Sequence, residues 1–188
     1  MEYSDQQLIV QYLEGSEDAF AFLVKRHLDG VYNFAMRLSG DNLLAEDIAQ
    51  ETFVKAWKNL KKYDHEKNFK TWLFTIARNT TIDHLRKRKN VPFSLFENSA
   101  GENFFVDNIK DENPRADEIF AIALRKEVVE AALLELPPKY KEVFILHEGE
   151  DMTFAEIGKI LDRPLDTVKS QYRRALLALK DLINKEKL

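Results

Sequence analysis

Residues 153–175 read TFAEIGKILDRPLDTVKSQYRRA and predict two short helices joined by a tight turn. Thr153 and Glu156 have the spacing of a capping box, in which each side chain satisfies a free backbone donor at a helix start. Pro164 ends the first helix, because proline cannot continue the helical hydrogen bonding and restricts the residue before it. A second helix follows from about Asp166. The stretch is therefore typical of a helix-turn-helix.

The predicted second helix has two different faces. Apolar side chains recur along one face with helical spacing, namely Val168, Tyr172, Ala175, Leu176 and Leu179. Ser170, Arg173 and Arg174 fall on the opposite face, with Lys169 at its margin. A short helix with a basic exposed face fits the major groove of DNA. An ordinary helical hairpin with a solvated basic face fits this segment equally well.

Composition indicates a folded protein. The chain has 188 residues, of which 45% are hydrophobic and 32% charged, enough for one medium domain or two small ones. The absence of cysteine excludes disulfides and thiolate metal sites. No apolar run has the length of a membrane span, and the first residues, MEYSDQQ, do not resemble a signal peptide. We therefore expect a cytoplasmic protein.

The net charge of −4 conceals an uneven distribution. Residues 91–124 hold two basic and seven acidic groups, so the excess of acid lies in the middle of the chain. By contrast, residues 69–89 hold six basic groups against a single acid, Asp83. Local charge decides binding over distances of about a Debye length. The sequence therefore offers two basic surfaces separated by an acidic connector.

Hydrophobic periodicity predicts helices throughout and shows no β-alternation. A short helix capped by Ser4 and Gln7 ends near Gly15. The further predicted helices are 17–38, 44–60, 69–89, 117–136 and 139–147. Leu28 and Trp57 are expected on their buried faces. The predicted fold class is all-α, with two small helical domains joined by a flexible acidic linker and a helix-turn-helix in the second. The predicted boundaries are 1–90 for the first domain, 91–117 for the linker and 118–188 for the second domain.

Enzyme chemistry has little support in the sequence. The four histidines are scattered, and no phosphate-binding glycine loop or nucleophile elbow is present. We therefore expect no catalytic site, metal, cofactor or small-molecule substrate. One polar cluster remains: Asp47, Gln50 and Glu51 are spaced to lie side by side on a helix. Spacing alone favours a solvated face for this trio over a docking site for a basic partner.

The predicted helix 69–89 interleaves aromatic and basic residues. That combination suits single-stranded nucleic acid, because rings stack on bases while cations follow phosphates. The alternative is that Phe69, Trp72 and their apolar neighbours form the core. The preceding loop, residues 63–68, is polar and long enough to hold a flipped base.

Four segments resemble, in order, the bacterial RNA polymerase sigma factors of the small extracytoplasmic-function (ECF) class. DAFAFLVKRHLDGVYNFAMRL, AEDIAQETFVKAWKNL and FKTWLFTIARNTTIDHLRKRK resemble the helices of the family's N-terminal domain. LLELPPKYKEVFILHEGEDMTFAEIGKILDRPLDTVKSQYRRAL resembles its promoter-reading C-terminal domain. The D-x-x-Q-E-x-F and W-L-x-x-I-A-x-N strings are more specific than a helix-turn-helix alone.

The resemblance implies a role for each matching position. Docking on core RNA polymerase is implied for Asp47, Gln50, Glu51 and Phe53, the last as a packing residue. Binding of the minus-10 element during melting is implied for Tyr63, Asp64, His65, Asn68, Arg78, Asn79, Arg86, Lys87 and Arg88. Reading of the minus-35 element is implied for Lys169, Ser170, Arg173 and Arg174.

The resemblance also implies partners: core RNA polymerase, promoter DNA as duplex and as single strand, and an anti-sigma factor, often a membrane protein. Two rivals remain: a helix-turn-helix regulator that binds duplex DNA without polymerase, and a helical adaptor that binds only protein. Some positions depart from the family. Asp162 and Asp166 stand where glycine is usual, and Gly158 where alanine is usual. Gln171 stands where a basic residue is common, which removes a phosphate contact or changes a base preference.

Overall fold

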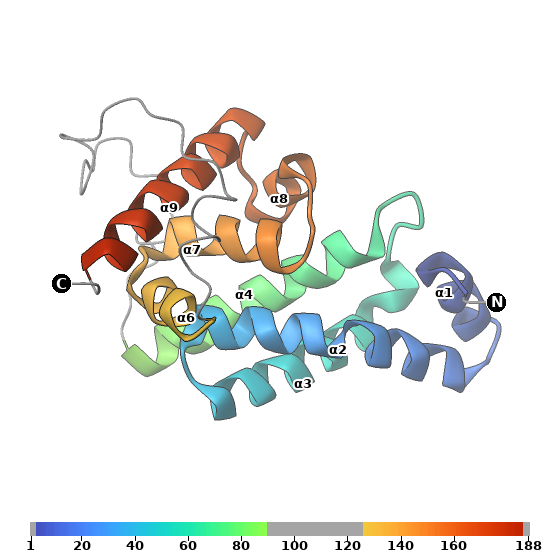
Figure 1. The fold of residues 1–188 in the computed structure, drawn as a ribbon. Helices are drawn as coiled ribbons and strands as arrows, with labels where there is room; N and C mark the ends of the chain where they lie inside the picture. Colours follow the sequence, from blue (N-terminus) through green and yellow to red (C-terminus); the bar gives the residue numbers. More distant parts are fainter. Residues whose placement is uncertain (1–2, 90–125, 186–188) are drawn as a thin grey trace. The chain divides into compact units, whose positions relative to one another are not determined.

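The computed structural model describes residues 3–89 and 126–185, and every regular element in these two ranges is helical (Figure 1). The chain divides into two compact units, one mainly of residues up to 90 and the other mainly of later residues. These observations confirm the predicted all-α fold with two domains. The predicted linker, 91–117, and the predicted helical residues 117–125 lie outside the described residues.

The first unit is built from four α-helices and a short 3-10 helix in residues 3–89. Their bounds are Asp5–Leu13 for α1, Glu17–Ser39 for α2, Asn42–Asn59 for α3, Leu60–Lys62 for η1 and Phe69–Lys89 for α4. Local signals set the starts. Ser4 and Gln7 form the predicted capping box of α1, and the Asp41 carboxylate caps α3 by accepting from the Leu44 N–H. Gly40 ends α2 in a left-handed conformation.

Helices α2, α3 and α4 pack around the core of the first unit. Phe34 of α2 meets Phe74 of α4 edge to face, with ring centroids 5.7 Å apart. Two expectations of burial are wrong, since Leu28 is 41% and Trp57 51% exposed. Trp57 lies three residues after the exposed Val54 and therefore on the same side of α3, whereas Ala56 is fully buried. The indole therefore leaves the buried face of α3.

The second unit contains five helical elements within residues 126–185, joined by short turns. Its elements are α6 (Lys126–Glu135), α7 (Pro138–Phe144), the π-helical η3 (Ile145–Gly149), α8 (Phe154–Leu161) and α9 (Leu165–Lys185). Its core joins α6, α7 and α9 through Ala132, Leu133, Leu136, Tyr140, Phe144, Ala175, Leu176, Leu179 and Ile183. Pro138 begins α7, where a missing N–H costs nothing. The predicted helix 139–147 is therefore present, with its last residues in the wider π turn.

The helix-turn-helix of the second unit has the predicted capping box. The Thr153 N–H donates to the Glu156 carboxylate at 2.9 Å, and the Glu156 N–H donates back to the Thr153 hydroxyl. Helix α8 ends at Leu161 and is followed by Asp162, whose φ of 52° is left-handed. The N–H of Arg163 then closes the turn by donating to the Gly158 carbonyl at 2.9 Å. A Cβ added to Gly158 would lie 2.9 Å from the carbonyl oxygen of Arg163, so glycine leaves room for this turn.

Replacing Asp162 with glycine should stabilise the turn of the helix-turn-helix. The left-handed region strains a residue that carries a Cβ, and glycine removes that strain. We expect Asp162→Gly to raise the free energy of unfolding by about 0.5–1 kcal/mol. Chemical denaturation would measure it, with Asp162→Ala as the matched variant expected to lie below both. A decrease for the glycine variant would mean that the Asp162 side chain stabilises the turn.

Candidate functional site

The outer face of α3 combines polar and apolar side chains. Asp47 and Gln50, predicted as docking residues, are both exposed. Leu43, Val54 and Trp57 are also exposed on α3, by 73%, 47% and 51%. Steps of three and four residues place all five side chains on one stripe. The apolar members of this stripe were not predicted as binding residues, although their spacing from Asp47 is visible in the sequence.

Two other predicted residues of α3 are engaged within the protein. Phe53 is 7% exposed and so serves as packing. The Glu51 carboxylate lies 2.7 Å from His84 Nε2 on α4 and 2.8 Å from Lys55 Nζ. Lys55 also donates to the Thr80 hydroxyl of α4 at 3.0 Å. Glu51 therefore links α3 to α4, a role that its exposed neighbour Asp47 does not share.

The contacts of Glu51 with His84 and Lys55 should make the free energy of unfolding vary with pH in the acid range. Hydrogen bonds from His84 and then Lys55 lower the Glu51 pKa from 4.5 to about 2. A lowered pKa stabilises the folded state above the unfolded-state pKa, and this contribution is lost as the pH falls from about 4.5 toward 2. We expect Glu51→Gln to flatten the fall in unfolding free energy across that window. Lys55→Met should give an intermediate slope, because His84 remains. Parallel curves for all three proteins, measured by denaturation at a series of pH values, would contradict this.

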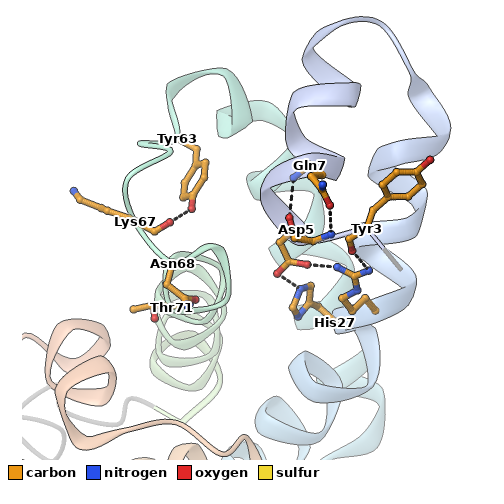
Figure 2. Close-up of polar contacts among 10 residues, drawn as sticks. Tyr3, Asp5, Gln7, His27, Tyr63, Lys67, Asn68 and Thr71 are labelled. Atoms are coloured by element: carbon orange, nitrogen blue, oxygen red, sulfur yellow. Dashed lines mark hydrogen bonds and ion pairs between the residues drawn. The ribbon is translucent and has the colours of Figure 1, made fainter. Parts of the chain in front are cut away.

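Helix α1 is tied to α2 close to the loop that precedes α4 (Figure 2). The Asp5 carboxylate accepts from Arg26 at 2.6 Å and lies 2.8 Å from His27 Nε2. Burial by itself raises the Asp5 pKa, but the hydrogen bonds from His27 and Arg26 outweigh it and lower the pKa below 3.8. The His27 ring in turn packs against Phe69, with centroids 5.6 Å apart. Phe69 is the first residue of α4, so α1 and α2 both support the end of the loop.

The loop of residues 63–68 is held by its own hydrogen bonds. The Tyr63 hydroxyl donates to the Lys67 carbonyl (Figure 2), and the Lys67 N–H donates to the Asp64 carbonyl at 3.0 Å. The Asp64 carboxylate accepts from the Glu66 N–H at 3.1 Å. The Asn68 side chain caps α4 by accepting from the Thr71 N–H at 3.0 Å. The backbone of the loop is therefore held by contacts within the chain itself.

The predicted minus-10 residues divide into buried and exposed groups. Tyr63 is 4% and Arg78 8% exposed, so both lie inside the first unit and only indirectly affect its surface. The Tyr63 ring packs against Trp72 at 5.0 Å, and burial raises the pKa of its hydroxyl. The exposed candidates are Asp64, His65, Asn68, Asn79, Arg86, Lys87 and Arg88. Arg88 forms an ion pair with the Asp41 carboxylate, the cap of α3.

The exposed face of α9 carries all four predicted minus-35 residues. Lys169, Ser170, Arg173 and Arg174 are exposed, and their spacing forms two adjacent rows on the helix. The Ser170 hydroxyl donates to the Thr167 carbonyl at 2.9 Å.

Gln171 departs from expectation. The resemblance implies an altered DNA contact at this position, but Gln171 is 4% exposed and its side-chain oxygen accepts from Arg163 at 3.0 Å. It lies on the packed side of α9, away from the exposed basic side chains, so it is not part of that basic face.

Within residues 3–89 and 126–185, no group of three or more histidine, cysteine, aspartate or glutamate side chains could hold a metal ion. No helix in the described parts of the chain is long and apolar enough to cross a membrane. The arrangement offers a polar and apolar stripe on α3, a hydrogen-bonded polar loop before α4 and a basic face on α9.

Both units of the chain resemble parts of known proteins. The family models Sigma-70 region 2 and Sigma-70, region 4 match residues 23–91 and 126–179. The ECF RNA polymerase sigma factor SigW of Bacillus subtilis is 34% identical over 182 residues, covering 96% of this chain and 97% of SigW. SigM of the same organism is 32% identical over 163 residues, covering 87% of this chain and 94% of SigM.

A solved structure agrees with this match. The sigma factor RpoE of Bartonella quintana, in complex with the anti-sigma factor NepR, has a TM-score of 0.66 and 27% identity. The similarity covers 88% of this chain and 96% of RpoE. CnrH, in complex with the cytosolic domain of CnrY, has a TM-score of 0.70 at 24% identity, which shows a shared fold.

Proposed function

The chain belongs to the ECF class of bacterial RNA polymerase sigma factors, and from this membership we propose how its surfaces divide the work of initiation. As an alternative sigma factor it binds core RNA polymerase and directs promoter recognition and transcription initiation. It supplies binding energy and no reaction chemistry of its own. Because polymerase and promoter DNA are cytoplasmic in bacteria, we place its activity there.

The stripe on α3 is the proposed surface for core polymerase. The observation that carries this proposal is the exposed row of Leu43, Asp47, Gln50, Val54 and Trp57. Large exposed apolar groups are costly to leave in water, and a row of them beside a carboxylate and an amide suits a protein partner with basic and apolar groups. A solvated helix face would not need Val54 and Trp57.

Asp47→Lys should weaken binding to core polymerase without unfolding the chain. Asp47 is exposed, so its replacement leaves the core intact, while the new charge faces a partner expected to be basic. We expect a loss of about 1 kcal/mol, or about fivefold in Kd. Glu51→Lys is the informative companion, because it also breaks the contacts with Lys55 and His84 and should lower the melting temperature. Unchanged polymerase affinity in a folded Asp47→Lys variant would show that this face of α3 is merely solvated and does not bind polymerase.

The loop before α4 is the proposed site for the minus-10 element. Its internal hydrogen bonds fix the backbone, so exposed Asp64, His65 and Asn68 can meet a flipped base without first ordering the chain. Asn79, Arg86, Lys87 and Arg88 extend along α4 and would contact neighbouring bases and phosphates. Arg88 must release Asp41 or share it to do so. Tyr63 and Arg78 support this surface from inside.

The exposed face of α9 is the proposed reader of the minus-35 element. Arginine pairs bidentately with guanine in the major groove, whereas lysine and serine contact backbone or base edges. Two exposed arginines at adjacent positions, Arg173 and Arg174, can therefore distinguish sequences. Lys169 and Ser170 lie one turn earlier on the same face.

We further propose an anti-sigma partner and a domain division. RpoE of Bartonella quintana is bound by an anti-sigma factor, NepR. We propose that an anti-sigma factor, either soluble or membrane-anchored, also binds this chain. The proposed division is 1–90 for polymerase and minus-10 binding, 91–117 for the linker and 118–188 for minus-35 binding. The two family matches, 23–91 and 126–179, are compatible with these bounds.

Co-purification with core polymerase tests the proposed function. The full chain is mixed with core RNA polymerase or with duplex DNA alone, and the complexes are separated by size. A stable complex with polymerase, and weak binding to duplex in its absence, is the expected result. Tight binding to duplex as a dimer, with no polymerase complex, would support the rival helix-turn-helix regulator and remove the proposed roles of the first unit.

A further inference from the structure

Three polar side chains form a buried network in the second unit. Arg163, Glu142 and Gln171 are 8%, 0% and 4% exposed. The Arg163 guanidinium lies 3.2 Å from the Glu142 carboxylate and donates to the Gln171 side-chain oxygen at 3.0 Å. A longer contact of 3.5 Å joins it to the Lys139 carbonyl. Charged residues are almost never fully buried unless they are paired. Pairing explains how Arg163 and Glu142 can lie inside the protein, but it does not explain what the network does.

Each member of the network comes from a different element. Glu142 lies in α7, Gln171 in α9, and Arg163 in the turn between α8 and α9. The Arg163 backbone is also fixed, because its N–H donates to the Gly158 carbonyl of α8 at 2.9 Å. The guanidinium therefore connects the turn of the helix-turn-helix to the helices on both sides.

Stability is a poor explanation for such a network. The desolvation of buried charges offsets most of their attraction, and apolar replacements of similar volume are often as stable. An apolar core already joins α7 to α9. Apolar packing tolerates rotation and repacking, whereas a planar guanidinium accepts partners only at set distances and angles. The apolar core already holds α7 and α9 together, and the network additionally fixes how α9 is oriented.

The orientation of α9 determines where its exposed side chains point. Gln171 follows Ser170 in sequence and lies on the packed side of the helix, while Lys169, Ser170, Arg173 and Arg174 lie outside. A helix is rigid enough that rotation about its axis moves all these side chains together. Rotation of α9 would therefore break the 3.0 Å contact between Arg163 and Gln171. Base reading depends on the same rotation, because bidentate contacts need set geometry.

We propose that Arg163, Glu142 and Gln171 are positioning residues that fix the rotation of α9 for sequence-specific reading of the minus-35 element. The proposal rests on the proposed function of α9 as the reader. The three side chains do not touch DNA. They act through Lys169, Ser170, Arg173 and Arg174, whose directions they set.

Three variants of the full chain, each assembled with core RNA polymerase, test this positioning role. The probe is a duplex selected by the parent holoenzyme from a pool randomised in the upstream block, compared with a duplex in which that block is scrambled. The first variant, Glu142→Leu/Arg163→Met/Gln171→Leu, makes the network apolar. The second, Glu142→Gln, removes the carboxylate. The third, Glu142→Gln/Gln171→Glu, returns a carboxylate to Arg163 from α9.

The expected readout is the ratio of affinities for the selected and scrambled duplexes. It should fall about tenfold in the folded apolar variant, equivalent to the loss of one base contact, while the salt dependence stays close to that of the parent. It should fall in Glu142→Gln and recover in Glu142→Gln/Gln171→Glu. A merely structural network would change the melting temperature and leave this ratio unchanged.

Two results would overturn the inference alone: a folded apolar variant with the parent's ratio, or a Glu142→Gln variant that keeps it. If the apolar variant does not fold, the comparison of Glu142→Gln with its double variant decides. A parent holoenzyme that does not distinguish the two duplexes would instead overturn the proposed role of α9, and the positioning role with it.

Discussion

Arg173→Ala and Arg174→Ala should each weaken recognition of the upstream promoter element by about 1–3 kcal/mol, or about 5- to 150-fold. Both side chains are exposed on α9, away from its packed face, so their removal leaves the core of the second unit intact. The loss comes from bidentate hydrogen bonds to guanine that alanine cannot make. Transcription from a dependent promoter, together with holoenzyme affinity for that promoter, measures it.

The same variants separate base reading from phosphate binding. If Arg173 or Arg174 contacts bases, its loss should reduce discrimination between the selected and scrambled upstream sequences. If it contacts only phosphate, affinity should fall equally for both sequences, and the dependence on salt should weaken. Full transcription from the dependent promoter in both variants would show that α9 does not read the element through these arginines.

Trp57→Ala should lower the affinity for core polymerase by about 2 kcal/mol, or about 30-fold in Kd. Tryptophan is enriched among the residues that dominate protein interfaces, because its large ring loses contact with water on binding. In the free chain the Trp57 side chain is 51% exposed, so its removal should cost the folded unit little. Titration of labelled protein with core polymerase gives the Kd, and thermal unfolding checks the fold.

Phe22→Ala is the matched control for Trp57→Ala. Phe22 is an aromatic residue of α2 that is 60% exposed, so the two variants remove similar side chains from different helices of the same unit. We expect Phe22→Ala to bind polymerase as the parent does. Equal losses in both variants would indicate a general effect on the first unit, and no loss in Trp57→Ala would place the polymerase surface away from α3.

Local signals in the sequence were enough to predict most of the fold. The capping boxes at Ser4 and Thr153 involve residues three positions apart, so their geometry is readable from the chain. Gly40 and the pair Pro137–Pro138 mark breaks between helices for equally local reasons. Helical periodicity also placed Ser170, Arg173 and Arg174 outside and Val168, Ala175 and Leu176 inside.

The burial of a side chain could not be predicted from the sequence where it depends on packing against residues far away along the chain. Trp57 is apolar and close to the buried stripe of α3, and only the neighbouring helices decide that Ala56, not Trp57, fills the core. Tyr63 and Arg78 have polar groups typical of a nucleic-acid surface, yet tertiary packing encloses both. Periodicity gives the face of a helix, but the width of the covered arc depends on its partners.

The buried network of the second unit shows the same limit. Arg163 pairs with Gln171, eight residues away, and with Glu142, 21 residues away. Each of these side chains reads as a surface residue when taken alone, and no single-sequence pattern links them. Glu51 is similar, since its partner His84 is 33 residues away. Such pairs of side chains can be identified only from the structure.

Promoter opening tests the central claim most directly. The full chain with core polymerase is added to a duplex promoter fragment selected by that holoenzyme and to the same fragment with a melted minus-10 region, and strand separation is followed by the reactivity of unpaired thymines. The account predicts opening of the duplex by holoenzyme alone, with neither chain nor core sufficient by itself, and tighter binding to the melted fragment. Stable binding to the duplex without polymerase, and no opening with it, would contradict the account.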